Sequence, residues 1–234
     1  MELRLQPGRF ACLLGANGCG KSTLLRCLAG LLAPEGAVEL DGAPLAALPL
    51  PRRARRLGFL PQEVHPAFAY TAAEAVALGA RVAGHGSWLG DDASTAAAVA
   101  AALAQVDAGE LGARALSELS GGERRRVLLA GVLAQEPDWL LLDEPAAMLD
   151  LHHQAALYRQ LRGLAHGGLG VLCVTHDWNL AARFADELLV LHEGVVAARG
   201  DAAEVLRREV LAPIFGDDFE ILAREGAPPA VLPR

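Results

Sequence analysis

Residues 15–23 read Gly-Ala-Asn-Gly-Cys-Gly-Lys-Ser-Thr and fit the pattern G-x-x-x-x-G-K-[S/T] of a phosphate-binding loop at every fixed position. The segment before it, Phe10 to Leu14, is almost entirely apolar, which predicts a buried strand. After it, leucines recur at helical spacing at positions 24, 25, 28 and 31. A loop between a strand and a helix is the setting that phosphate binding requires, so we favour this function over a glycine-rich turn with a chance lysine.

The residue types in this loop suit a polyphosphate. Backbone N–H groups must converge on the phosphates, and glycines permit the tight turns that aim them. The positive end of the following helix adds to the attraction. We expect Lys21 to reach the β- and γ-phosphates and Ser22 to offer its hydroxyl to Mg²⁺. The predicted nucleotide contacts in the loop are Gly15, Asn17, Gly18, Cys19, Gly20, Lys21, Ser22 and Thr23.

Composition excludes several classes of protein. The 53% hydrophobic content of the 234 residues rules out a disordered chain. A net charge of -7 argues against a dedicated nucleic-acid binder, which needs a basic face. The four cysteines form no CxxC pair, so neither a zinc site nor a disulfide framework is indicated. No apolar run reaches the ~20 residues of a membrane span, and we expect no signal peptide.

Two further apolar segments end in polar residues. Residues 139–142 lead to Asp143 and Glu144, and residues 171–174 lead to Thr175 and His176. In an open parallel sheet, sites lie at the carboxyl ends of the strands. The pattern therefore predicts an α/β fold with metal chemistry near Asp143 and Glu144.

The middle of the chain has a different character. From residue 64 to residue 119 it reads as helices, with a capping box from Thr71 to Glu74 and an alanine-rich helix over residues 94–106. At the start of the chain, Leu3 and Leu5 alternate with charged residues and predict an edge strand. The proline-containing tail from Gly226 is predicted to be mobile.

Taken in order, these segments resemble the ATP-binding subunits of ABC transporters, and the match covers nearly the whole chain. The residues that carry it are the Walker A loop at 15–23, the Q-loop Gln62, the signature at 119–123, Walker B at 140–144, the D-loop ending at Asp150 and the switch His176.

The resemblance implies a P-loop NTPase (RecA-like) core with a small antiparallel β subdomain and an inserted α-helical subdomain. Residues 1–234 would form a single ABC ATP-binding domain. Its core would comprise about residues 1–62 and 119–234, and its helical subdomain about residues 63–118.

The resemblance also implies ATP and Mg²⁺ as cofactors. Asp143, together with Ser22 and Gln62, would hold Mg²⁺, because a hard cation prefers oxygen ligands. Glu144 would orient or deprotonate the attacking water, and His176 would contact the γ-phosphate and keep the water in line. The implied catalytic residues are Glu144, His176, Lys21 and Gln62.

In this family the signature serves the nucleotide of a second copy. Ser120, Gly121 and Gly122 would present a hydroxyl, N–H groups and a helix N-terminus to ATP held by the partner, and Asp150 would lie at the same interface. The implied partners are a second copy of the chain, transmembrane permease subunits and, indirectly, a substrate-binding protein. No nucleic-acid partner is expected, and Val64 to Leu78 is the candidate surface for the permease.

Several stretches look like subunits serving importers of iron-siderophores, haem and vitamin B12, namely residues 18–20, 68–79, 150–154 and 176–181. We therefore expect an ATPase at the cytoplasmic face of the membrane that energises such import. Two alternatives stay open. One is an ABC ATPase that acts on ribosomes or DNA ends, although these carry paired cassettes or a long coiled-coil insert. The other is a nucleotide-dependent regulator that does not hydrolyse ATP.

The sequence departs from the family pattern in three places. Glu123 stands where glutamine is commoner, and residues 146–148 of the D-loop lack the usual polar side chains. The usual N-terminal strand with an aromatic that stacks on adenine is absent. Either the native chain starts further upstream, or base binding is weaker and less selective here.

Overall fold

The computed structural model describes residues 2–64, 69–85 and 93–234, and its largest sheet has the strand order β4-β5-β6-β1-β7-β8. The first five strands in this order are parallel, and the last pairs antiparallel with its neighbour. The α/β prediction is therefore confirmed. The strands are β1 (Phe10–Gly15), β4 (Leu57–Leu60), β5 (Trp139–Asp143), β6 (Gly170–Val174), β7 (Glu187–His192) and β8 (Val195–Gly200).

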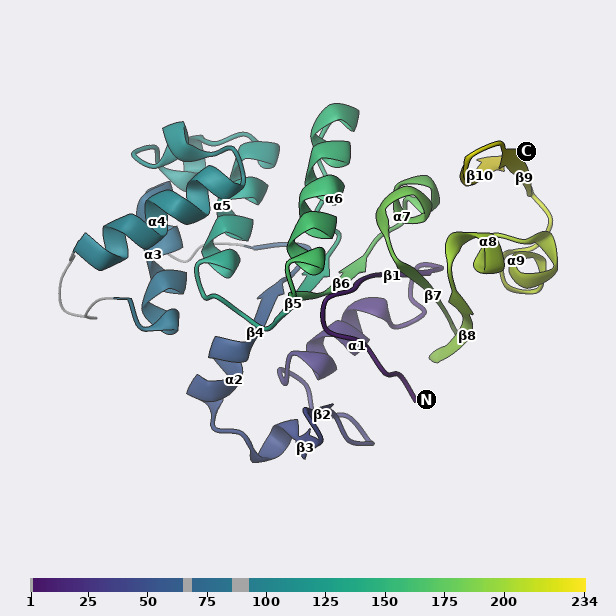
Figure 1. Ribbon diagram of the computed structural model, residues 1–234, viewed down its shortest axis with the longest axis horizontal. Coiled ribbons are helices and arrows are strands. Elements are labelled where there is room, and N and C mark those ends of the chain that lie inside the picture. Colours follow the sequence, from purple (N-terminus) through teal and green to yellow (C-terminus); the bar gives the residue numbers. More distant parts are fainter. Residues whose placement is uncertain (1, 65–68, 86–92) are drawn as a thin grey trace.

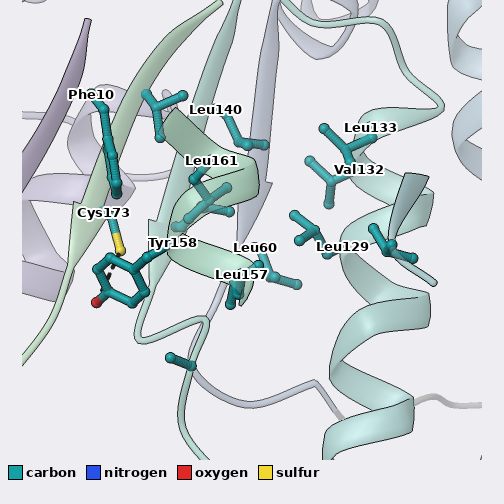
Figure 2. Packing of buried hydrophobic residues seen from close by; sticks show 14 of the residues in the cluster. Phe10, Leu60, Leu129, Val132, Leu133, Leu140, Leu157, Tyr158, Leu161 and Cys173 are labelled. Atoms are coloured by element: carbon teal, nitrogen blue, oxygen red, sulfur yellow. Dashed lines mark hydrogen bonds between the residues drawn. The ribbon is translucent and has the colours of Figure 1, made fainter. Parts of the chain in front are cut away.

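Helices cover both faces of this sheet (Figure 1). Alternate residues of β1 point to opposite faces, as the pleat requires. Ala11 and Leu13 join a cluster with Leu25 of α1 (Lys21–Leu28). On the other face, Phe10 packs against Tyr158 of α6 (Leu151–His166), with the rings tilted by 48° and their centroids 5.9 Å apart. Figure 2 shows leucines of α6 and of the neighbouring helix α5 (Gly121–Leu133) converging on the same strands. Both faces are therefore buried, which accounts for the nearly continuous apolar strands.

The helical insert packs against α5 beside the edge of the sheet that carries β4 (Figure 1). It contains α3 (Ala72–Ala83) and α4 (Ala93–Gln105), followed by short 3₁₀ turns at Gly109–Leu111 and Leu116–Glu118. The predicted capping box is confirmed, since the Thr71 side chain accepts from the Glu74 N–H and the Glu74 carboxylate accepts from the Thr71 N–H.

A small β unit follows α1. Strands β2 (Glu39–Leu40) and β3 (Ala43–Pro44) pair through a turn in which Asp41 and Gly42 both have positive φ, 52° and 76°. An Asp-Gly pair favours such a hairpin turn, because both residues adopt positive φ readily. The 3₁₀ turn Leu45–Ala47 and helix α2 (Leu50–Arg56) then lead into β4.

The edge strand predicted at Leu3 and Leu5 is wrong. Residues 2–6, all of them described, belong to no strand. The side chains of Leu3 and Leu5 instead pack on the cluster of Ala11 and Leu13, and the Arg4 carbonyl accepts from Arg199. Alternation predicted correctly that Leu3 and Leu5 are the partly buried side chains, but within the described ranges this segment pairs with no strand.

The prediction of a mobile tail from Gly226 is also wrong. After α7 (Trp178–Phe184), β7 and β8, the chain forms α8 (Ala202–Val205), α9 (Arg208–Phe215) and the hairpin β9 (Phe219–Arg224) with β10 (Ala227–Pro233). Asn179 of α7 donates to the Val231 carbonyl at 3.1 Å and accepts from its N–H at 2.9 Å. The prolines are accommodated because β10 pairs on one side only and its register shifts between Ala227 and Ala230.

A close helix crossing in the insert gives a test of the packing. A methyl group on Gly79 of α3 would overlap the carbonyl oxygen of Gly131 in α5. We expect Gly79→Ala to lower the free energy of unfolding by about 1–3 kcal/mol, as overpacking does. The matched control is Gly163→Ala in α6, where a methyl group meets nothing within 4 Å, so helix propensity should raise stability by about 1 kcal/mol. Equal effects of the two substitutions in urea denaturation would contradict this close approach.

Candidate nucleotide site

The phosphate-binding loop connects the buried end of β1 to α1, as predicted. Gly15 requires a glycine for lack of space, because a methyl group there would overlap the Leu191 carbonyl oxygen and lie 2.8 Å from the Cys19 sulfur. Gly18 and Gly20 require glycine for their backbone, with φ of 77° and 103°. The three glycines therefore allow the tight turns of this loop, in which backbone N–H groups can point toward a bound phosphate.

Lys21 is the first residue of α1, and only 6% of it is exposed. Its ammonium group donates to the carbonyl oxygens of Gly15 and Ala16, at 2.9 Å in each case. The side chain thus folds back over the loop, and the first turn of α1 contains no acidic residue. Cationic charge, free helix N–H groups and the helix dipole all favour an anion at this position.

The other residues of the loop differ in exposure. Asn17, Gly18 and Thr23 are exposed, whereas Cys19 and Ser22 are partly buried. Ser22 is the second residue of α1, directly after Lys21. The residue expected to serve the metal therefore directly follows the residue expected to serve the phosphates.

The structure brings three predicted residues into contact around one carboxylate. The Glu144 side chain accepts a hydrogen bond from Gln62 Nε2 at 3.2 Å, and its other oxygen lies 2.6 Å from His176 Nε2. These residues follow β4, β5 and β6, which are neighbours in the sheet. Glu144 adopts a φ of 49°, and its N–H donates to the Val174 carbonyl at the end of β6. In a continued strand, Glu144 would point to the face of the sheet opposite Asp143. The left-handed backbone at Glu144 changes this direction, so both carboxylates can lie at the same edge of the sheet.

Asp143, the last residue of β5, is 2% exposed, and its Oδ1 atom has no hydrogen-bond partner among the described residues. A buried carboxylate oxygen without a partner costs free energy unless a cation or donor satisfies it. The residue is thus held ready for a ligand at the edge of the sheet where the loop and Glu144 lie.

The signature and the D-loop lie next to each other. Ser120 caps α5 in a capping box with Glu123, and the hydrogen bond from the Ser120 N–H lowers the pKa of the Glu123 carboxyl. The glutamate at position 123 therefore has a local function in place of glutamine. A methyl group on Gly121 would lie 3.2 Å from the Met148 sulfur, and one on Gly122 would lie 3.0 Å from Leu149.

Asp150 caps α6, and the hydrogen bond from the His153 N–H lowers the pKa of its carboxyl. Within the described part of the chain, hydrogen bonds link neither Ser120 nor Asp150 to the loop at residues 15–23. The structure therefore brings together Lys21, Asp143, Glu144, Gln62 and His176 along one edge of the sheet and leaves the signature with the D-loop.

A cavity of about 1200 Å³ lies beside the loop and is lined by Cys19, Gly20 and Thr23 as well as by residues 2–5. Among the described residues that line it, the one aromatic side chain is Trp139. Trp139 begins β5, so it lies toward the sheet edge opposite the loop. The expectation of an adenine site without the usual N-terminal aromatic stays a prediction.

Sequence reasoning missed Arg125 of α5. Although charged, it is 8% exposed, and it donates to backbone carbonyls around Gln62 and Asp143. It stands within three consecutive arginines, a pattern that usually indicates a solvated helix face. The signal available was its position, since Arg125 shares a face of α5 with the buried Leu129, Val132 and Leu133, at helical spacings of four, seven and eight residues.

The family model described as ABC transporter matches residues 1–147 of this chain. The chain belongs to the ABC transporter family. Binding of nucleotide and its hydrolysis in the service of transport follow from this membership and agree with the loop described above. Among the described residues, no helix is both long enough and apolar enough to cross a bilayer.

Curated relatives match along the whole length. The hemin import ATP-binding protein HmuV of Myxococcus xanthus (strain DK1622) is 45% identical over 242 residues, which covers 100% of this chain and 90% of the relative. The protein of the same name from Burkholderia mallei (strain ATCC 23344) is 44% identical over 260 residues, covering 100% and 93%.

Solved structures agree with the fold. A chain assigned to a metal-chelate type ABC transporter in an inward-facing conformation superposes with a TM-score of 0.84 at 28% identity, covering 100% of this ABC ATPase and 89% of that chain. The ATP-binding cassette MJ0796, solved as a dimer bound to ADP and Pi, gives a TM-score of 0.76 at 28% identity, covering 85% and 88%.

The position of Lys21 gives a test of the phosphate site. We expect Lys21→Met to weaken binding of an ATP analogue at least tenfold, because a charge-assisted hydrogen bond is worth about 1.5–3 kcal/mol. Titration calorimetry with the purified chain measures the affinity. The control is Arg26→Met, an exposed position in the last turn of the same helix, which should bind like the parent. An affinity of Lys21→Met within twofold of the parent would contradict the assignment.

Proposed function

We propose that this chain is the ATP-hydrolysing subunit of an importer for haem or a related metal chelate. The observation that carries the proposal is the Glu144 carboxylate held between Gln62 and His176, on the edge of the sheet where the Lys21 loop opens. The cargo class is supported by relatives that are named hemin import ATP-binding proteins and that this chain matches over its full length.

The residues present fit a magnesium ion. Asp143 offers a buried, unpartnered carboxylate oxygen, and Ser22 and Gln62 would complete the oxygen ligands together with the phosphates. When bound, Mg²⁺ supplies positive charge to the phosphate oxygens. The loop from Gly15 to Thr23 would hold the phosphates, and Lys21 would exchange its two carbonyl partners for phosphate oxygens.

Hydrolysis requires a water aligned with the γ-phosphate. Glu144 accepts a proton from this water or orients it, because its carboxylate is fixed on one side by Gln62 and on the other by His176. His176 is half-exposed, so its ring can also reach the phosphate side of the site. Catalysis thus depends on positioning and on charge, as phosphoryl transfer generally does.

The second half of the site comes from a second copy of the chain. Ser120, Gly121 and Gly122 would cover the nucleotide of the partner, and Asp150 would lie at the same interface. Two apolar residues beside them, Met148 and Leu151, are 85% and 75% exposed, which favours a surface that another protein covers.

The proposed organisation is a single ABC ATP-binding domain over residues 1–234, with a core of about residues 1–62 and 119–234 and a helical subdomain of about residues 63–118. The surface proposed for the permease extends from Val64 to Leu78, of which residues 65–68 lie outside the described ranges. With a permease as partner, the subunit would work at the cytoplasmic face of the membrane. A substrate-binding protein would act on it indirectly.

The role of Glu144 predicts a specific phenotype. We expect Glu144→Gln to bind ATP with the affinity of the parent but to lose at least 99% of the turnover, and to accumulate a dimer that encloses nucleotide. The amide keeps the shape of the side chain and removes the base. Phosphate release measures turnover, and gel filtration with ATP measures the dimer. Turnover at the rate of the parent would show that another group activates the water.

The transport assignment is tested by its partners. We expect the tagged chain, purified from membranes in mild detergent, to bring down a many-helix permease, and we expect haem-loaded binding protein to stimulate its ATPase activity. Recovery of ribosomes or DNA-end factors in place of a permease would refute transport. The Glu144→Gln chain should recover the same permease, which separates assembly from hydrolysis.

A further inference from the structure

Arg125 is a buried cation that the proposed mechanism does not use. Its guanidinium donates to four backbone carbonyls: Nη1 to Pro61 at 2.6 Å and Gln62 at 3.1 Å, Nη2 to Asp143 at 2.5 Å, and Nε to Pro145 at 3.4 Å. Two of these carbonyls belong to the segment after β4 and two to the segment around the end of β5. One side chain therefore joins two segments that are more than 80 positions apart in the sequence.

The guanidinium is suited to this arrangement by its shape. It presents five N–H donors in a rigid plane and stays charged even though burial lowers the pKa of Arg125. Within the described ranges it forms no salt bridge, and its charge is compensated by the carbonyl dipoles and by the nearby carboxylates of Asp143 and Glu144. A shorter side chain, or one with a single donor group, could donate to the carbonyls of one segment and would leave those of the other segment without a donor.

The two segments that Arg125 joins carry the catalytic contact. Gln62 and Glu144 follow the two strands directly, and their side chains meet at 3.2 Å. That distance depends on the relative position of the two segments beyond the last pair of the ladder, Leu60 with Leu142. Beyond this pair, hydrogen bonds from the guanidinium to carbonyls of both segments hold them together in place of strand-to-strand hydrogen bonds.

Arg125 also belongs to the signature helix. It stands five positions after Ser120, the cap of α5, and α5 runs beside β4 (Figure 1). Ser120 and the backbone of Arg125 belong to the same helix. If Ser120 moves toward or away from a facing nucleotide, the backbone of Arg125 therefore moves with it.

We propose that Arg125 is a positioning residue that fixes Gln62 and Glu144 relative to each other and to the signature helix. The inference rests on the proposed hydrolytic function. Among the described residues, the hydrogen bonds of Arg125 go to backbone carbonyls and not to the side chains of Gln62 and Glu144. It sets the geometry of these two side chains, which would hold the attacking water, and it makes this geometry depend on the position of α5.

The neighbouring arginines provide matched controls, since they also donate to backbone carbonyls. Arg124 donates to Leu116 at 3.0 Å and Leu119 at 3.4 Å, and Arg126 donates to Asp107 at 2.9 Å. In the described part of the chain, neither of them donates to the segments that carry Gln62 and Glu144. Loss of either side chain should affect stability without affecting attack geometry.

The test compares Arg125→Lys and Arg125→Gln with Arg124→Gln and Arg126→Gln in the complex isolated from membranes. We expect the position-125 variants to lower kcat by about tenfold to a hundredfold, the cost of a displacement of about 1 Å, with KM for ATP within threefold of the parent. The controls should keep kcat within twofold. Melting temperatures of all variants identify the position-125 variant closest in stability to the controls, and that variant is used for the decision.

A double-mutant cycle separates positioning from general stability. In a Gln62→Ala background, Arg125→Lys should cost less than threefold in kcat, because the contact that it positions is already absent. Equal costs in both backgrounds, a kcat like that of the controls, or a KM that rises in step with the loss of kcat would overturn the inference. A parent complex without ATPase activity would instead refute the proposed function itself.

Discussion

The site depends on the order in which parallel strands lie side by side. Because β4, β5, β6 and β1 are neighbours and run in one direction, the residues that follow them meet at one edge. Gln62, Glu144, His176 and Lys21 come from distant parts of the sequence and reach this edge without any long loop. The two clusters that bury the faces of the sheet hold these strands in register, so the precision of the site comes from the core.

Within this frame, backbone conformation decides which side chains are usable. Adjacent acids on a strand point to opposite sides, so Asp143 stays buried while Glu144 needs a left-handed conformation to reach Gln62 and His176. The N–H of Glu144 donates to Val174, which ties this strained residue to the end of β6. A cost in backbone energy at this position is thus accepted where the chemistry takes place.

Sequence reasoning succeeded where local chemistry dictates structure. The loop glycines, the capping box at Thr71 and the Asp41-Gly42 turn each follow from the residues themselves. It failed where the outcome depends on a distant partner. The alternation at Leu3 and Leu5 predicts which side chains are buried, but it does not show whether another strand lies alongside. The prolines after Gly226 indicate a mobile tail, whereas the chain there forms a hairpin that is hydrogen-bonded to Asn179. The burial of Arg125 was not predicted, because its four carbonyl partners come from other segments of the chain.

Lys21 is the only lysine in this sequence of 234 residues, and its ammonium group donates to two carbonyl oxygens of the loop. Apart from the histidines, every other basic side chain of the sequence is an arginine. Acylating reagents and amine-directed cross-linkers therefore have one side-chain target here, at the centre of the phosphate site. Their reaction with that side chain reports whether the loop is free or filled.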